Sequence, residues 1–574
     1  MTTRSLNLAR PRPLVVEEQP PRVSRPVSPN HWFLDFARAA FGTIRLTFRA
    51  KGATKVEVAL GEKLNDDARI DREPPGCVRF RAVTLDIGSG TQTVRVEIPP
   101  DERNTGSHAI HVPSHLFEVM PFRYAEVTVP VDSGVELVES VRLAMFYPFG
   151  DSAACFRCDD DRLNQVWELC KYSIKATSFL GVYVDGDRER IPYEADAYIN
   201  QLCHYGVDAE YELARHTIEY LLFHPTWPTE WSLHCLPMAW ADYEYTGRTD
   251  LLEAYADVLE RKALRDLARE DGLISTETGR VTPDLLAGLF LDRPLKDIVD
   301  WPPGSFTDGG TGERDGYDMV PVKTAVNAFY IWNLRLLERT SRLLGNTDAA
   351  RYAEEASRAT DALWHTCFSK ERGIFLDGEG SDHASLHANM LPAAFGLLPP
   401  GAEASVTALI RSRGMACSVY GAQYLLDACY RLGDAAHALD LMTAEHDRGW
   451  LNMIRAGSTV TLEAWDHRYK NNLDWNHAWG AVPANIIPRF VAGVRPATPG
   501  FEAVLVAPRL GHLLQISAVV PTPRGPVSIE VEKSADKGRL LVDTPVPVVF
   551  DLEGAATTMD TTVPAPPGRH ERFF

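Results

Sequence analysis

The spacing of apolar residues changes twice along this 574-residue chain, and the change limits the folds open to it. From residue 31 to about residue 148, short runs such as KVEVAL and TQTVRVEI alternate apolar and polar residues between turns rich in Gly, Pro, Asp and Asn. Alternation with a period of two is typical of antiparallel strands that bury one face. The pattern predicts a β-sandwich over residues 31–150, preceded by a Pro-rich segment, residues 1–30, that we expect to lie on the surface as a tail or strap.

Helical spacing replaces this alternation between residues 160 and 492. Segments such as DDDRLNQVWELCKYSIKATS and VKTAVNAFYIWNLRLLERTSRLL carry apolar residues at i, i+3, i+4 and i+7, and several begin after Asp, Thr or Asn and end near Gly. This predicts an all-α domain of helical hairpins over residues 151–496, arranged as a closed barrel of paired helices. A helix solenoid is the alternative, which the lack of a fixed repeat disfavours. From Pro499 the alternation returns, as in PVSIEVEK, and predicts a smaller β domain over residues 497–574.

Composition excludes several classes of partner. The formal charge of -19, with no long run of Lys or Arg, disfavours a nucleic-acid ligand. No stretch of 18 apolar residues occurs, so we expect no membrane partner, and the Pro-rich, charged start does not resemble a signal peptide, so we expect a cytoplasmic location. Cys155 and Cys158 form a CxxC without a second pair at zinc-like spacing, so we expect free or buried thiols, no metal and no cofactor. The oligomeric state is not determined by these patterns.

The segment from residue 181 to residue 205 concentrates charge at one point. Five carboxylates and two arginines fall within residues 185–196, between the apolar run FLGVYV and the helix-like ADAYINQLCHYGV. Alternating charges in that position indicate carboxylates held by cations at a loop end, which is how a catalytic acid is positioned. The run DGDRER by itself is more often a solvated, salt-bridged loop than a site.

A second loop, residues 449–482, carries the run TLEAWDHRYKNNLDWNHAWG. In it Glu463 lies close to Leu462 and Trp465. Loops at one end of a helical ring can converge over a cavity, and two distant carboxylates in different surroundings are what hydrolysis of a glycosidic bond requires. Taken alone, Glu463 would be a buried glutamate paired with Arg455 or His467, and His477 a core histidine.

Tryptophans accompany both loops. Their rings can stack on the apolar faces of sugars, but each is also a common core residue, so we leave both interpretations open. The tryptophans of the predicted helical domain that we considered are Trp227, Trp231, Trp240, Trp301, Trp450, Trp465, Trp475 and Trp479.

Two motifs resemble those of one known family. RERIPYEADA resembles the signature of glycoside hydrolase family 78, the α-L-rhamnosidases, in which Arg-Glu-Arg-Leu-Gly-Trp-Thr-Gly-Asp-Ala follows Asp-Cys-Pro, and STVTLEAWD resembles the family's Ala-Thr-Thr-x-Trp-Glu-x-Trp. NHAWGAV, DWPPG at residues 300–304 and TEWSLHCLPMAW at residues 229–240 are similar to further family segments. The resemblance extends over most of the chain and implies a central (α/α)6 barrel flanked by N-terminal and C-terminal β-sandwich domains.

The resemblance also implies roles for single residues. Glu189 falls on the family's general acid and Glu463 on its general base, which activates water. We expect the remaining candidates to bind the substrate: Asp185, Arg188, Tyr193, Asp196, Trp231, Asp300, Trp301, Trp465 and His477.

This chain departs from the family pattern beside the general acid. Val184 occupies the place of the family's first Asp, with Asp185 one residue later, and Pro192, Tyr193 and Glu194 replace Gly-Trp-Thr. The hydrolytic machinery thus carries over more safely than the sugar preference.

The resemblance therefore implies an inverting exo-glycoside hydrolase that releases terminal α-L-rhamnose, or a related deoxy sugar, from a carbohydrate substrate. Two alternatives keep the same fold. One is another helical-barrel enzyme, such as an α-L-fucosidase or a disaccharide phosphorylase, and the other is a sugar-binding protein without catalysis.

Overall fold

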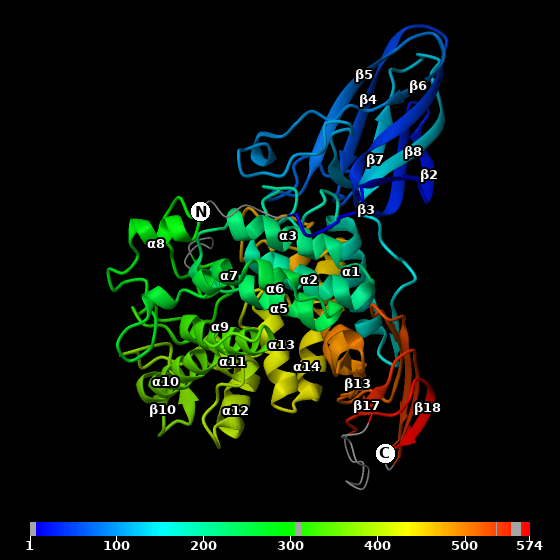
Figure 1. The fold of residues 1–574 in the computed structure, drawn as a ribbon. Helices are drawn as coiled ribbons and strands as arrows, with labels where there is room; N and C mark the ends of the chain where they lie inside the picture. Colours follow the sequence, from blue (N-terminus) through cyan, green and yellow to red (C-terminus); the bar gives the residue numbers. More distant parts are fainter. Residues whose placement is uncertain (1–6, 305–311, 535–536, 553–563) are drawn as a thin grey trace.

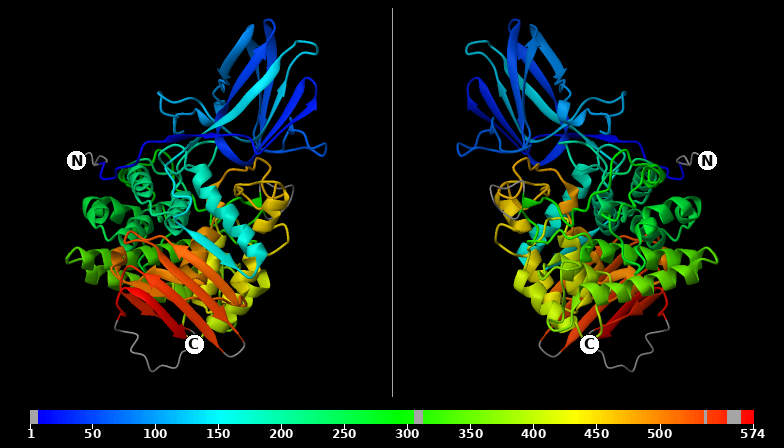
Figure 2. Two further views of the ribbon diagram at one scale, coloured as in Figure 1. Left: turned by 90° about the vertical axis from the view of Figure 1, so that its right-hand side faces the viewer. Right: turned by 90° about the vertical axis from the view of Figure 1, so that its left-hand side faces the viewer.

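The computed structural model describes residues 7–304, 312–534, 537–552 and 564–574. It has three parts in chain order: an N-terminal sheet, a helical middle and C-terminal sheets (Figure 1). The N-terminal sheet lies over one end of the helical part, and the C-terminal strands lie against its flank toward the other end (Figure 2). The chain is therefore a mixed α and β protein with several domains.

The N-terminal sheet has eight strands in the order β1-β8-β3-β7-β4-β5, with β2 and β6 also paired to β3. The long strand β3 runs through the centre, and alternating residues along it, such as Leu34, Phe36, Ile44, Leu46 and Phe48, build a core of their own. The strands are β1 (Val15–Gln19), β2 (Val23–Ser28), β3 (His31–Ala50), β4 (Thr54–Gly61), β5 (Phe80–Ile87), β6 (Gly90–Arg95), β7 (Met120–Thr128) and β8 (Glu136–Phe146).

The first two strands fall within the Pro-rich segment that we expected to be a tail or strap. β1 pairs with β8 and β2 pairs with β3, although most of their side chains are exposed. Pro26 has no N–H to donate to a neighbouring strand. It is tolerated in β2 because, among the described strands, β2 pairs with β3 alone and so lies at an edge. An exposed edge strand lacks the buried alternation that identifies a strand in a sequence.

The middle of the chain is helical, as the apolar spacing predicts. In α1 the side chain of Asp160 caps the first turn by accepting from the N–H of Arg162, and Val166, Cys170 and Ile174 are buried one turn apart. Neighbouring helices pack against each other, as α9 does on α10 and α11 on α13. None of the described helices combines the length and apolarity that crossing a bilayer requires.

The helices, in chain order, are α1 (Asp161–Thr177), α2 (Glu194–Val207), α3 (Glu212–Phe223), α4 (Thr229–Ser232), α5 (Cys235–Thr246), α6 (Asp250–Ala254), α7 (Ala256–Lys262), α8 (Pro283–Gly288), α9 (Thr324–Leu343), α10 (Ala349–Cys367), α11 (His387–Ala394), α12 (Glu403–Arg413), α13 (Ala422–Arg431), α14 (Ala435–Met442), α15 (Trp450–Arg455) and α16 (Pro483–Ile486). A short hairpin, β10 (Phe368–Ser369) and β11 (Ile374–Phe375), follows α10.

Two sheets form the C-terminal part. A three-stranded sheet has the order β12-β13-β17, and a five-stranded sheet has the order β18-β16-β15-β14-β9. Strand β9 comes from residues 155–158, before the first helix, so the helical part and the C-terminal part interlock. The strands are β9 (Cys155–Cys158), β12 (Val494–Pro496), β13 (Val504–Val506), β14 (Gln515–Val520), β15 (Val527–Lys533), β16 (Gly538–Thr544), β17 (Val548–Phe550) and β18 (Gly568–Phe573).

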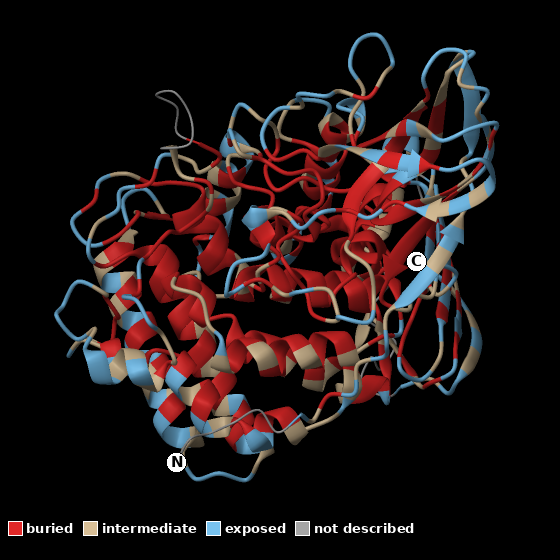
Figure 3. Cartoon of the chain, turned by 90° about the horizontal axis from the view of Figure 1, so that it is seen from above, coloured by how far each residue is buried: buried red, intermediate tan, exposed pale blue. Residues whose placement is uncertain are grey.

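Buried residues fill the interior of the helical part, while exposed residues follow its outer turns and the strand edges (Figure 3). One continuous apolar cluster joins the helices to the C-terminal sheets, from Val166 in α1 to Ile516 in β14. The N-terminal sheet keeps a separate cluster, which includes Val58. The helical and C-terminal parts thus share a core, and the N-terminal sheet does not belong to it.

Candidate active site

Two loops that are distant in the chain meet at one cavity of about 200 Å³. The first loop, residues 178–193, joins α1 to α2, and the second, residues 456–482, follows α15. Residues 179–184 of the first loop pack under the N-terminal sheet, where Phe179 stacks on Phe41 with ring centroids 3.6 Å apart. The cavity is lined by Asp185, Arg188, Glu189, Tyr193, Asp196, Trp227, Trp231, Ile298, Trp301, Glu463, His477 and Trp479.

Glu463 is one of the buried carboxylates of the cavity, with only 2% of its side chain exposed. Arg188 Nη1 donates to its Oε2 at 2.8 Å, and Lys470 Nζ lies 3.1 Å from its Oε1. The indole N–H of Trp479 donates to the backbone carbonyl of Glu463 at 2.9 Å and fixes the loop at this residue. The cations beside Glu463 are therefore Arg188 and Lys470, rather than Arg455 or His467.

Glu189 is the more open carboxylate, with 37% of its side chain exposed. The hydroxyl of Tyr193 donates to its Oε2 at 2.8 Å, and Arg188 Nη2 lies 3.6 Å from the same oxygen. The two terminal nitrogens of one guanidinium therefore face the two glutamates, Nη1 toward Glu463 and Nη2 toward Glu189. The planar fork of an arginine holds two carboxylates at a defined spacing in a way that a lysine cannot.

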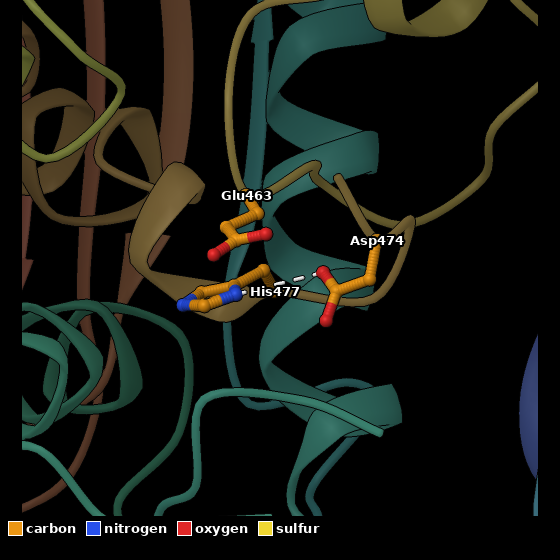
Figure 4. A group of neighbouring side chains, drawn as sticks. All are labelled: Glu463, Asp474 and His477. Atoms are coloured by element: carbon orange, nitrogen blue, oxygen red, sulfur yellow. Dashed lines mark ion pairs between the residues drawn. The ribbon is translucent and has the colours of Figure 1, made fainter. Parts of the chain in front are cut away.

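His477 lies between two further carboxylates in the same site. Its Nε2 is 2.6 Å from Asp196 Oδ1, and its Nδ1 is 3.5 Å from Asp474 Oδ1; Figure 4 shows Asp474 and Glu463 beside the ring. Burial alone would lower the pKa of His477, but Asp196 and then Asp474 outweigh it and raise that pKa to about 10. Burial likewise opposes ionisation of Asp474, yet the His477 cation and then Arg188 and Lys470 lower its pKa.

Asp185 has the opposite electrostatic environment. Burial, and then repulsion from Glu189, raise its pKa well above the usual range, against the weaker effects of Arg188 and His477. Its Oδ1 accepts from the N–H of Ile191 at 2.9 Å, whereas its buried Oδ2 has no hydrogen-bond partner within the protein. A raised pKa favours the protonated form of this carboxyl group, and in that form it can donate a hydrogen bond to a ligand hydroxyl in the cavity.

Glu463, Asp474 and His477 are also the kind of residues that bind metals. Within the described residues their ligand atoms lie within 4.8 Å of one another. A histidine must be neutral to coordinate a metal, however, and the raised pKa keeps His477 protonated. Arg188 and Lys470 already neutralise Glu463. The group therefore fits a charge-balanced organic ligand site better than a metal site.

Most of the candidates from the sequence lie together. Those that line the cavity are Asp185, Arg188, Glu189, Tyr193, Asp196, Trp231, Trp301, Glu463 and His477. Asp300 and Trp465 lie behind this lining: Asp300 accepts from His387 Nε2 at 2.7 Å and from the Trp301 N–H at 2.8 Å, so it supports the loop that carries Trp301. The buried Trp465 donates to the carbonyl of Cys417 at 2.8 Å and packs edge-on against Trp450.

The cavity also has lining residues that were not assigned to the site from the sequence. Trp227, Ile298 and Trp479 belong to it. Trp227 and Trp479 were among the tryptophans considered for sugar stacking, but no local pattern separated them from core residues such as Trp450. Ile298 gave no signal, because a lone isoleucine in a loop has the same appearance wherever the loop lies.

Residues in the connections of the N-terminal domain also hold the two site loops. Arg79 Nε forms a buried ion pair with Asp187 Oδ2 at 2.5 Å, and Asn104 donates to the Asp187 carbonyl at 2.8 Å. Asn476 accepts from the Asp187 N–H at 2.7 Å and donates to Glu62 at 3.2 Å. Both loops are thus tied to the connections that follow β4, precede β5 and follow β6, directly beside Arg188 and Glu189.

Comparison with known proteins agrees with this fold and site. Family models for bacterial α-L-rhamnosidases match three parts of the chain: the concanavalin-like domain at residues 25–142, the 6 hairpin glycosidase domain at residues 151–491 and the C-terminal domain at residues 493–564. Glycosidases of this six-hairpin type are the class that the helical middle and its two-loop cavity define. The chain belongs to the bacterial α-L-rhamnosidase family, glycoside hydrolase family 78, and the family expected from the motifs is confirmed.

Individual relatives are distant and longer. An α-L-rhamnosidase of Alteromonas sp. (strain LOR) is 24% identical over 264 residues, covering 43% of this chain and 28% of that protein. The α-L-rhamnosidase structure from Dictyoglumus thermophilum has a TM-score of 0.75 at 15% identity over 98% of this chain and 64% of that one. The Streptomyces avermitilis α-L-rhamnosidase complexed with L-rhamnose has a TM-score of 0.72 at 19% identity over 98% and 54%. These likenesses show the shared fold.

Proposed function

We propose that this protein is an inverting exo-glycoside hydrolase that releases terminal α-L-rhamnose, or a related deoxy sugar, from glycosides or oligosaccharides. The observation that carries the proposal is the pair Glu189 and Glu463, which face one sugar-sized cavity from the two ends of the Arg188 guanidinium. Because both contact the same guanidinium, Glu189 Oε2 and Glu463 Oε2 can be separated by at most the width of that group plus the two contact distances. Such a spacing fits a water between acid and base, for which inverting enzymes use roughly 6.5–9.5 Å.

In this mechanism the two glutamates divide the proton transfers. Glu189, the more exposed carboxyl, protonates the glycosidic oxygen as the bond to the anomeric carbon breaks. Glu463, neutralised by Arg188 and Lys470, accepts a proton from the water that attacks the same carbon from the other face. Attack from the face opposite the leaving group converts the α-glycoside into β-L-rhamnose. The tryptophans of the lining offer apolar surfaces to the sugar ring, and Asp185, Asp196 and His477 offer hydrogen bonds.

We further propose that the helices of residues 151–496 form an (α/α)6 barrel that carries this site, between β domains at residues 31–150 and 497–574. The mutual packing of neighbouring helices and the match of the 6 hairpin glycosidase model support this arrangement. The Streptomyces avermitilis relative with bound L-rhamnose supports the choice of sugar. A carboxylate that can activate water favours hydrolysis over phosphorolysis, because phosphate is itself the nucleophile in phosphorolysis and needs no such base.

The acid and base assignments can be tested with two leaving groups. Glu463→Gln should lower kcat by about 10²–10⁴ on both 4-nitrophenyl and methyl α-L-rhamnoside. Glu189→Gln should cost as much on the methyl glycoside and far less on the nitrophenyl one, because nitrophenolate leaves without a proton. Glu168→Gln, in an exposed ion pair with Arg38, is the matched control and should retain activity.

The stereochemistry is read from the first product anomer by NMR, for which we expect β-L-rhamnose. Near wild-type rates for Glu189→Gln or Glu463→Gln would remove the assignment. Phosphate-dependent cleavage would favour the phosphorylase alternative, and tight sugar binding without turnover of any glycoside would favour the binding protein.

A further inference from the structure

A second hollow opens directly beside the sugar cavity. Its volume is about 250 Å³, against about 200 Å³ for the sugar cavity, and Tyr193 and Trp227 line both. Two shared wall residues make the two hollows neighbours along one path. Within the proposed reaction, the space next to the sugar is where the leaving group of the substrate must lie.

The surface of this hollow is aromatic. Tyr220, Phe223 and Phe290 line it together with Trp227, and all four rings are half-buried. Phe223 and Phe290 meet edge to face with ring centroids 5.2 Å apart. Phe290 also adopts a left-handed backbone conformation with φ +64°, which is rare for a bulky residue and is found at functional positions more often than elsewhere. Partly exposed aromatic rings gathered around one hollow are typical of a binding site for a flat apolar group.

The segment that departs from the family motif builds the wall between the hollows. Pro192 and Tyr193 line the second hollow, and Glu194 is buried behind them. Glu194 accepts from the N–H of Thr226 at 3.0 Å and also from its hydroxyl, which fixes the loop that carries Trp227. The three residues that replace Gly-Trp-Thr therefore shape this hollow as a unit.

The proposed acid lies at the boundary. Tyr193, on the shared wall, donates to Glu189 at 2.8 Å, while Glu463 is buried on the sugar side and absent from the lining of the second hollow. A general acid must reach the oxygen that joins sugar to leaving group. This geometry would place that oxygen between the hollows, with the sugar on one side and the leaving group on the other.

We propose that the hollow lined by Tyr220, Phe223, Trp227 and Phe290 binds the leaving group of the substrate, and that this group is a planar aromatic alcohol. The inference rests on the proposed glycosidase function and names its substrate class. A sugar can stack only the apolar C–H groups of its ring on such a lining, whereas a flat aromatic ring has two wholly apolar faces and buries more apolar area among several aromatic side chains. The exposed side chains of His108, His224 and Arg293 at the rim are available to ring hydroxyls.

The test compares two substrates with leaving groups of similar acidity, 2-(2-naphthyl)ethyl and ethyl α-L-rhamnoside. Because the bond that breaks is alike in both, the ratio of their kcat/KM values isolates binding of the aromatic part. We expect the wild type to favour the naphthyl substrate by about tenfold or more, and Phe290→Ala to remove most of that preference, in line with the loss of one aromatic contact and its buried area.

A second variant tests the subsite even if Phe290→Ala does not fold. Leu291→Trp adds a ring at the edge of the hollow instead of removing one, and should also reduce the ratio by filling the space. Phe368→Ala is the matched control, since Phe368 is equally half-buried in another surface hollow beside Trp364 and His365, and should leave the ratio unchanged.

The possible outcomes distinguish a failure of the aromatic subsite from a failure of the proposed glycosidase function. A wild-type ratio near one, a ratio that Phe290→Ala and Leu291→Trp leave unchanged, or faster cleavage of a rhamnosyl disaccharide than of the naphthyl substrate would overturn the aromatic subsite and leave the glycosidase proposal standing. Failure to cleave any rhamnoside would overturn the proposed function, and the subsite with it.

Discussion

Arg188 joins the two proposed catalytic carboxylates, and the groups around it explain how so many charges share one buried site. Glu463, Asp474 and Asp196 are balanced by Arg188, Lys470 and His477, while burial raises the pKa of Asp185 and so disfavours its charged form. A buried charge without a partner is costly, so each of these residues depends on its neighbours. The raised pKa values of His477 and Asp185 each lead to a prediction.

The first prediction concerns His477. Its pKa is about 10 in the folded protein, against about 6.5 in an unfolded chain, so the folded state binds the additional proton. Its contribution to stability is fully present below about pH 6.5 and is lost as pH rises through about 10. We expect the Tm of the wild type to fall over this window more steeply than that of His477→Gln. The exposed His115→Gln is the control; parallel curves for wild type and His477→Gln would contradict the assignment.

The second prediction concerns Asp185. Burial raises the pKa of Asp185 and favours its protonated form, which an amide resembles, so Asp185→Asn should keep KM for an α-L-rhamnoside within a few-fold of wild type. Asp185→Ala removes the hydrogen bond that we propose to the sugar and should raise KM about tenfold. Steady-state kinetics of both variants at pH 7 decide the point, and an Asn variant as impaired as the Ala variant would mean that the charge is needed.

At the scale of elements, the loop that carries Glu189 depends on the N-terminal sheet. Asp187 is paired with Arg79 from that sheet and with Arg190, whose guanidinium also reaches Glu118 at 2.7 Å. Arg190 has a left-handed backbone with φ +56°, so the turn needs these contacts to persist. Since Arg188 and Glu189 lie between Asp187 and Arg190, the sheet positions the proposed acid without touching the substrate.

Arg79→Leu should therefore affect both stability and catalysis. Removing one partner of a buried ion pair costs about 3–5 kcal/mol in unfolding free energy, and we expect kcat to fall with little change in KM. Arg49→Leu breaks an exposed pair with Glu136 on the same sheet and should cost about 1 kcal/mol or less. Urea unfolding and kinetics on one aryl rhamnoside compare the two. Because Arg79 also pairs with Asp101 and Asp187 with Arg190, the pairing is read from a double-mutant cycle: Arg79→Leu/Asp187→Leu should lose less stability than the two single variants added together, and additive losses would contradict the pairing.

At the scale of the whole molecule, the separate apolar clusters predict how the protein unfolds. The helical part and the C-terminal sheets share one core, closed by the pairing of β9 with β14, while the N-terminal sheet has its own. Calorimetry should therefore resolve two transitions. Ile516→Ala in β14 should lower the midpoint temperature of one transition and Val58→Ala in β4 that of the other. Each variant should reduce the unfolding free energy of its own unit by about 1–5 kcal/mol.

The exposed Ser517→Ala, next to Ile516 in β14, should move neither transition. A single transition that both core variants shift equally would show that the contacts between the N-terminal sheet and the catalytic loops make the molecule one cooperative unit.

Prediction from the sequence was most successful where the signal is local. The helices from α1 onward follow from apolar spacing and caps such as Asp160, and the two site loops follow from motifs. Strands β1 and β2 were not predicted, because both are exposed edge strands without alternating apolar and polar residues, and β2 contains Pro26. Strand β9 was missed as part of the C-terminal sheet because its pairing with β14 spans more than 350 residues, a distance over which spacing carries no information.

The sequence by itself determined the order of β, α and β segments, the family and the two carboxylates proposed for catalysis, because each depends on residue type and short spacing. Only the tertiary structure decided which tryptophans line the cavity, that Arg188 joins Glu189 to Glu463, and that Arg79 holds the loop from another sheet. Those contacts depend on how distant segments pack, and packing sets burial, charge pairing and hence the protonation of Asp185 and His477. The aromatic hollow beside the sugar cavity also depends on tertiary contacts. The three residues that replace Gly-Trp-Thr shape it because Glu194, one of them, accepts hydrogen bonds from Thr226 in a distant loop.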